Sequence, residues 1–263
     1  MLFYQIMNLI KINKIEKISI ILLFLLPLSI IFSKFVSDFI IVIFALFYFI
    51  NIENANTNLN RKFYLNFFSI AFFLFITFSS ISSILSSNQL LSLKSSFLHF
   101  RFLFSAIFLS YIFLLDTNKT LKIFFYILLS CYLSLLFDGS YQFIFKENIF
   151  GYSADPQTRV SSFFFDELVL GSYLSRLFPI LVFLYVFLKL RINKFLILYF
   201  LIHLYFVCFI SGERLSFFIL NIYYFLFSIF FLKGKLKKIL FIFTFFCIFL
   251  SSLHFSDNFN SRS

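Results

Sequence analysis

The stretch Leu188–Ser216, LKLRINKFLILYFLIHLYFVCFISGERLS, decides the fold. Its middle, residues 195–211, is an apolar run that follows three basic residues and ends beside the charged pair Glu213 and Arg214. The hydrocarbon core of a bilayer is about 30 Å thick, and roughly 17–25 apolar helical residues cross it. We therefore predict a transmembrane helix here, with a tight turn at its end.

The same composition continues through the chain. Its 263 residues are 62% hydrophobic and 13% charged, with a mean hydropathy of +1.00, which is far more apolar than a water-soluble domain requires. Hydropathy predicts an all-α, polytopic integral membrane protein, with one transmembrane domain over residues 1–263 and a loop at 138–165. The nine predicted helices are 18–34, 38–50, 63–85, 97–115, 121–137, 166–188, 195–211, 214–232 and 239–254.

The distribution of basic residues predicts the orientation. With the N-terminus in the cytoplasm, 14 of the 22 Lys and Arg residues lie in cytoplasmic segments, and the acidic residues show the opposite bias. The net charge of +11 is thus explained by topology, and no nucleic-acid partner is expected. The three cysteines lie in apolar runs whose spacing fits no metal site, and we expect neither a metal nor a cofactor.

Charged residues cluster where the 138–165 loop is predicted to re-enter the membrane. Asp166, Glu167 and Arg176 fall within the predicted sixth helix, and residues 166, 169, 173 and 176 would share one helical face. A charge near mid-membrane costs roughly 2.5–3.5 kcal/mol, so Arg176 should face the bundle interior or a wet cavity. The alternative is a structural ion pair with another helix.

The loop itself alternates aromatic and polar residues. Gly139 and Gly151 suggest turns, and Tyr141 is one of several rings in the segment. These rings could lie in the headgroup zone or stack on sugars.

Three motifs carry a family resemblance: DGSYQ at 138–142, RVSSFFFDELVLGSYLSR at 159–176 and SGERLSF at 211–217. Together they resemble the bacterial O-antigen ligase and O-antigen polymerase family, in detail over residues 130–235. The resemblance implies a GT-C-like glycosyltransferase bundle in the bacterial inner membrane that acts in lipopolysaccharide and cell-envelope biosynthesis. It would transfer a glycan from undecaprenyl diphosphate to a lipid A-core or glycan acceptor, without a metal.

In that family, arginines at the outer helix ends bind the diphosphate, and Arg159 and Arg214 match them by motif position. Two planar guanidinium groups would stabilise the negative charge that develops on a departing diphosphate. Further residues of this region are expected to bind the substrate. These are Arg176, Glu213, Asp166, Glu167, Tyr141 and Gln142. We further expect Glu213 to orient Arg214 or to pair with Arg159.

Family members usually continue with a larger periplasmic segment that carries a histidine thought to act as the base. Residues 255–263 would be the start of that segment, so the chain resembles a truncated member that lacks the base. His99, His203 and His254 are not expected to replace it. Four alternatives remain at this stage: ligase against polymerase, a glycosyltransferase using monophosphate-linked sugars with Asp38 as its acidic residue, a transporter or flippase, and an inactive remnant. Asp38 could equally be a helix N-cap.

Overall fold

A computed structural model describes residues 14–50, 67–115, 117–153 and 159–231, with a few positions between 234 and 242. The predicted all-α class is confirmed over these ranges, which contain helices and no β-strand. The predicted ninth helix and the segment 255–263 lie outside the residues described in full. The chain divides into two compact units, Met1–Phe124 and Phe125–Ser263, and each is described by itself.

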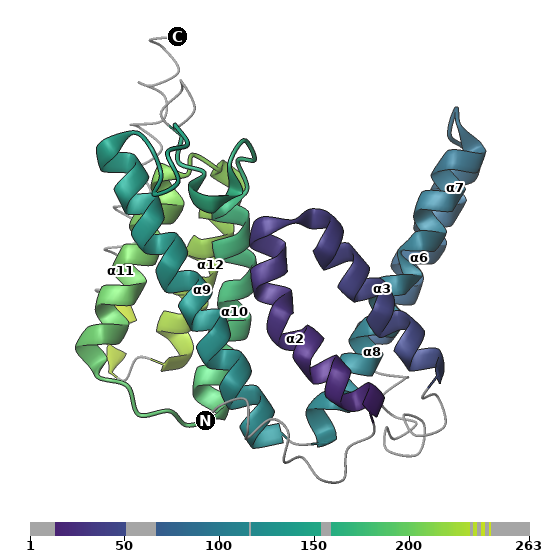
Figure 1. Cartoon of the computed structure of the whole chain (residues 1–263), viewed down its shortest axis with the longest axis horizontal. Helices are drawn as coiled ribbons and strands as arrows, with labels where there is room; N and C mark the ends of the chain where they lie inside the picture. The colour runs from purple at the N-terminus through teal and green to yellow at the C-terminus, as the bar shows by residue number, and fades with distance from the viewer. Residues whose placement is uncertain are drawn as a thin grey trace. The chain divides into compact units, whose positions relative to one another are not determined.

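Five helices lie wholly within the described residues of the first unit. They are α2 (Lys14–Phe32), α3 (Lys34–Ile50), α6 (Phe67–Ile84), α7 (Gln89–Leu98) and α8 (Phe100–Leu115). Helix α3 packs against α2 and α8, and α6 and α7 form a helical hairpin (Figure 1). The hydroxyl of Tyr111 on α8 donates to the buried carboxylate of Glu16 on α2 at 2.5 Å, which gives this unit a polar contact in its core.

The other described helices belong mainly to the second unit. Helix α9 (Thr117–Phe145) enters it from the first unit, and η1 (Ser162–Phe164), α10 (Leu170–Phe187), α11 (Lys194–Ile210) and α12 (Arg214–Phe231) follow. Helices α10, α11 and α12 pack on one another, with α9 alongside (Figure 1). The loop between α9 and α10 and the turn between α11 and α12 lie at the same end of this unit.

Tyrosine hydroxyls connect the helices of the second unit. Tyr132 on α9 donates to the carbonyl of Leu174 on α10, and Tyr224 on α12 donates to the carbonyl of Leu201 on α11, both at 2.7 Å. Both tyrosines are buried. A polar group away from water must find an internal partner, and these bonds provide one while they align neighbouring helices.

Five described helices are long and apolar enough to cross a membrane, which indicates a multi-pass membrane protein. They cover Lys14–Phe32, Phe67–Ile84, Gln89–Phe113, Asn118–Phe145 and Leu170–Phe187, and the helices Lys194–Ile210 and Arg214–Phe227 are shorter. Large apolar side chains remain on the outside, including Phe67 at 83% and Phe195 at 80% exposure. Water disfavours such surfaces, whereas lipid chains cover them.

Two helix boundaries differ from the prediction in ways that affect the site. Helix α9 continues through residues 138–145, which were predicted as loop. Its 29 residues span about 44 Å, well beyond a hydrocarbon core of about 30 Å, so its last two turns can be polar. Helix α10 begins at Leu170 rather than at residue 166, because Asp166 and Glu167 belong to the turn after η1.

Candidate functional site

The turn between α11 and α12 is three residues long. It runs from Ser211 to Glu213, and Gly212 adopts φ +70°, a left-handed conformation that glycine accepts without a Cβ penalty. The Gly212 N–H donates to the carbonyl of Phe209 at 3.1 Å, which closes the end of α11. The predicted tight turn is therefore present, and it places the start of α12 beside the end of α11.

Glu213 caps a helix that is distant in sequence. Its Oε1 accepts the main-chain N–H of Gly171 at 2.7 Å, and its Oε2 accepts the N–H of Ser172 at 3.0 Å and the Ser172 hydroxyl at 2.5 Å. The N-cap residue of α10 is Val169, whose side chain cannot accept a hydrogen bond. A carboxylate at a helix N-terminus satisfies otherwise unpaired N–H groups and is stabilised by the helix dipole. Glu213 thus supplies the cap that Val169 lacks.

Gly171 lets this carboxylate approach. A Cβ atom at this position would lie 2.5 Å from the Ser211 hydroxyl oxygen and 3.1 Å from Oε1 of Glu213. Ser216 adds a further bond, because its hydroxyl donates to Oε2 of Glu213 at 2.8 Å. The α11–α12 turn and the N-terminus of α10 are therefore held together by a compact hydrogen-bond network.

This network changes the expected role of Glu213. We expected its carboxylate to orient Arg214 or to pair with Arg159. Its described hydrogen bonds go instead to α10 and to Ser216, and within the described ranges no ion pair joins it to either arginine. The reason is geometric, since the unpaired N–H groups of α10 point at the carboxylate. Among the described residues, Glu213 therefore forms no ion pair that would neutralise Arg159 or Arg214.

Arg159 lies directly against the turn. The N–H of the next residue, Val160, donates to the carbonyl of Ile210 at 3.4 Å, and the half-buried Arg159 side chain passes over Gly212. A Cβ built on Gly212 would be 3.0 Å from Cγ of Arg159 and 3.1 Å from its Nε. Across the described residues, the Arg159 guanidinium makes no hydrogen bond or ion pair.

Arg214 is the first residue of α12 and is exposed. A cation at a helix N-terminus sits at the positive end of the helix dipole, which is the unfavourable end. Like Arg159, it has no ion pair or hydrogen-bonded side-chain partner in the part of the chain that the structure describes. The structure therefore places Arg159 against Gly212 and Arg214 directly after the same turn, next to a helix N-terminus that also favours an anion.

Arg176 does not follow the predicted arrangement. Residues 166 and 169 precede α10, so the predicted stripe of 166, 169, 173 and 176 is not a helical face. Tyr173 is buried, whereas the Arg176 side chain is exposed on α10 and has no ion pair with any described residue. The inward positions are taken by Tyr173, Leu174 and Phe178. The expectation that Arg176 faces the interior of the bundle is not met within the second unit.

The two acidic residues before α10 are exposed. Asp166 lies in the turn that follows η1, and the Glu167 N–H donates to the carbonyl of Phe164 at 3.0 Å. Phe165, between them and η1, adopts φ 55° and ψ −118°, a conformation rare for a non-glycine residue. Such a conformation persists only where the surrounding contacts hold it.

A buried polar cluster that was not predicted holds the segment at the start of η1. It is formed by Asp138, Gln142, Asn148 and Ser162, each at most 1% exposed. Oε1 of Gln142 accepts the N–H groups of Ser161 and Ser162 at 3.0 and 2.7 Å. The Ser162 hydroxyl donates to Asp138 at 2.6 Å, and the Asn148 side chain donates to the Ser162 carbonyl at 3.0 Å.

Gln142 is fully buried and its oxygen accepts two N–H groups, which gives it a positioning role in the loop, while the expected substrate contact stays a prediction. Its neighbour Tyr141 is half-buried, with its ring centroid 4.4 Å from that of Phe145. The signal for the cluster was available: Asp138 and Gln142 are four residues apart, the spacing of one helix face.

A further interhelical contact lies beside this cluster, between partly exposed residues. The Ser140 hydroxyl and Nε2 of His203 are 2.7 Å apart, joining α9 to α11. This agrees with the expectation that His203 is a packed, hydrogen-bonded histidine.

The first unit holds an ion pair and a serine-lined cleft. Asp38 lies one turn into α3, which begins at Lys34, so the N-cap alternative is wrong. Its carboxylate pairs with Arg101 on α8 at 3.2 Å.

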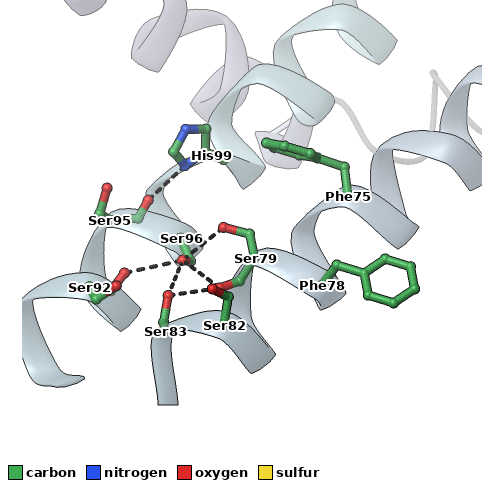
Figure 2. Close-up of a pocket in the computed structure, with 9 residues that line it drawn as sticks. All are labelled: Phe75, Phe78, Ser79, Ser82, Ser83, Ser92, Ser95, Ser96 and His99. Atoms are coloured by element: carbon green, nitrogen blue, oxygen red, sulfur yellow. Dashed lines mark hydrogen bonds between the residues drawn. The ribbon is translucent and has the colours of Figure 1, made fainter. Parts of the chain in front are cut away.

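The cleft, of about 490 Å³, lies between α6 and α7. In Figure 2 the hydroxyls of Ser79, Ser83 and Ser96 point toward one another, with Ser83 and Ser96 separated by 2.7 Å. Small residues with paired hydroxyls are a common way to hold membrane helices together.

Comparison of the chain with protein-family models, with curated proteins and with solved structures finds no match. The arrangement of Arg159, Gly212, Glu213 and Arg214 at the end of the second unit is accordingly the basis for a functional proposal.

Proposed function

We propose that the α11–α12 turn binds the diphosphate of a lipid-linked glycan, and that the protein transfers this glycan to a lipid A-core or glycan acceptor. The donor would be an undecaprenyl-diphosphate-linked glycan, as the motif resemblance to the O-antigen ligase and polymerase family suggests. The observation that carries the proposal is the pair of arginines at one turn, Arg159 against Gly212 and Arg214 directly after it, without an ion-paired partner among the described residues.

The charge balance of the turn supports an anionic ligand. Glu213 directly precedes Arg214 in sequence, and its carboxylate already accepts hydrogen bonds from the N-terminus of α10. Unpaired cations next to lipid are costly, so two such arginines favour a negatively charged partner. A diphosphate fits because each guanidinium can donate two parallel hydrogen bonds to phosphate oxygens.

The same geometry suits glycosyl transfer. The reaction breaks the bond between the sugar carbon and the diphosphate oxygen, and the electron pair leaves with the diphosphate. The oxygen of the acceptor hydroxyl attacks the same carbon and forms the new glycosidic bond, and its proton passes to the departing diphosphate or to water. Fixed donors that face the departing oxygens stabilise the transition state more than the ground state. Arg159 and Arg214 would supply that stabilisation with their own charge.

The proposal includes a location. We place the protein in the bacterial inner membrane with a cytoplasmic N-terminus, so that the α11–α12 turn opens toward the periplasm. This orientation follows from the excess of Lys and Arg in the segments assigned to the cytoplasm.

The test uses the full chain in cells whose own copy is replaced by a variant. Arg159→Lys and Arg214→Lys keep the charge but lose the paired donors, so each should reduce the transferred O-polysaccharide, on the order of 10²-fold if one phosphate contact resembles one oxyanion-hole donor. Lys146→Ala is the control, since Lys146 is an exposed cation of the preceding loop that lies over the Phe143 ring. Glycolipid gels report the result, and normal ladders from both arginine variants would refute the proposal.

A further inference from the structure

The main chain at Arg159 is fixed from two directions. The Val160 N–H bonds to the end of α11, and the N–H groups of Ser161 and Ser162 bond to Gln142 on α9. Val160 and Ser161 are also buried, at 1% and 3% exposure. The backbone therefore has little freedom, and the position of the guanidinium depends on the path of the Arg159 side chain.

That path runs over the bare face of Gly212. The atoms of Arg159 that a Cβ at residue 212 would meet are Cγ at 3.0 Å, Nε at 3.1 Å and Cδ at 3.2 Å. Ordinary contacts of a Cβ atom are longer, so a methyl group here would push the Arg159 side chain aside by a few tenths of an ångström. Gly212 thus leaves open the space that Arg159 occupies.

The turn cannot easily move away from such a methyl group. Glu213 is bonded to Gly171 and Ser172 of α10, and the Gly212 N–H closes α11. Shifting the turn would break several of these bonds at once, whereas the Arg159 side chain has no hydrogen bond to lose within the described ranges. The side chain is the part that would give way.

We infer that Gly212 is a positioning residue for Arg159: its missing side chain sets the path by which the guanidinium reaches the anion site. The inference rests on the proposed function, because it assigns Gly212 a role in binding the diphosphate through Arg159. This positioning role is distinct from the ordinary role of glycine, which is to adopt the left-handed conformation of a turn.

Gly151 provides a matched control. It has φ +82°, close to the +70° of Gly212, but a Cβ added there meets nothing within 4 Å. Gly151→Ala therefore imposes similar backbone strain without touching Arg159. A second variant, Gly212→Asn, keeps the contact while reducing the strain, because Asn tolerates the left-handed region better than Ala.

The experiment measures binding of farnesyl diphosphate, a soluble probe with a lipid diphosphate, to the full chain in nanodiscs by calorimetry, with farnesol as the uncharged comparison. Gly212→Ala and Gly212→Asn should each weaken binding about tenfold, as expected when one charged donor is misplaced, and Gly151→Ala should not. Thermal unfolding should show similar losses for the two Gly→Ala variants. Adding Gly212→Ala to Arg159→Ala should weaken binding no further.

The outcomes separate the two ideas. If Arg159→Ala binds the probe as well as the unchanged protein, or farnesol binds equally well, the proposed diphosphate site is wrong. If Arg159→Ala loses binding while Gly212→Ala and Gly212→Asn keep it, the site stands and the positioning role of Gly212 is refuted. Equal losses in Gly212→Ala and Gly151→Ala would also refute it, by assigning the effect to backbone strain.

Discussion

The carboxylate of Glu213 accepts the main-chain N–H of Gly171 at 2.7 Å, and through this bond the start of α12 caps the start of α10. The two residues are far apart in sequence, yet the contact decides where α10 begins and what Glu213 can do. A helix whose own N-cap is valine depends on such an external acceptor.

Replacing Glu213 with Gln should destabilise the second unit. The amide keeps one acceptor oxygen but turns an NH₂ donor toward the donors of Gly171 and Ser172, and it removes the charge at the helix N-terminus. We expect a loss of about 1–2 kcal/mol, seen as a fall in the thermal midpoint of about 2–8 °C. Glu147→Gln, at an exposed loop position, is the control. An unchanged midpoint would contradict the capping role.

Gln142 should matter for the loop rather than for ligand contact. Gln142→Met removes the oxygen that accepts the N–H groups of Ser161 and Ser162 and leaves both without an acceptor in a buried site. Each unpaired group costs about 1–3 kcal/mol. We expect lower stability and faster hydrogen exchange at Ser161 and Ser162, measured by mass spectrometry. Tyr141→Phe, at the adjacent position, should leave exchange at these residues unchanged, and equal exchange in Gln142→Met and the unchanged protein would contradict the prediction.

A helix could be predicted where the residues that start and end it lie next to its boundaries in the sequence. Helix α11 was expected at 195–211 and lies at Lys194–Ile210, because Asn193 caps its start by accepting the Phe195 N–H at 3.0 Å and Gly212 follows its end. These signals lie within a few residues of the boundary and are legible in the sequence.

The start of α10 could not be predicted in this way. Its cap comes from Glu213, and Asp138, Ser140 and Gln142 bond to residues distant in sequence, including Ser162 and His203. Local start and stop signals therefore do not locate this boundary. Of the expected site, the turn with Arg159 and Arg214 is present. Arg176, however, is exposed, and Gln142 is buried. The residues that a helix turns inward were predicted from its expected limits, and here tertiary contacts set those limits.

Asp38 tests the alternative that uses monophosphate-linked sugars. Its carboxylate is bound to Arg101, and the pair is partly exposed, at 54% and 28% for the two side chains. Exposed ion pairs contribute about 0–1 kcal/mol, so Asp38→Asn should reduce stability only slightly. We also expect normal O-polysaccharide ladders from this variant. Loss of transfer with unchanged stability would instead assign the acidic catalytic group to Asp38.

Helix α9 should carry the chain from the cytoplasm to the periplasm, and this determines which side the arginine-bearing turn faces. Lys119 lies in its first turn, Ser153 lies beyond its end, and the intervening Asn118–Phe145 is long and apolar enough to cross a membrane. Arg191, after α10, should return to the cytoplasm. Reporter fusions at Lys119, Ser153 and Arg191 should therefore read inside, outside and inside. Because the α9–α10 loop and the α11–α12 turn lie at the same end of the second unit, a cytoplasmic signal at Ser153 would place Arg159 and Arg214 on the cytoplasmic side. Transfer to a periplasmic acceptor would then be impossible, and the proposed function would have to be abandoned even if the turn bound diphosphates.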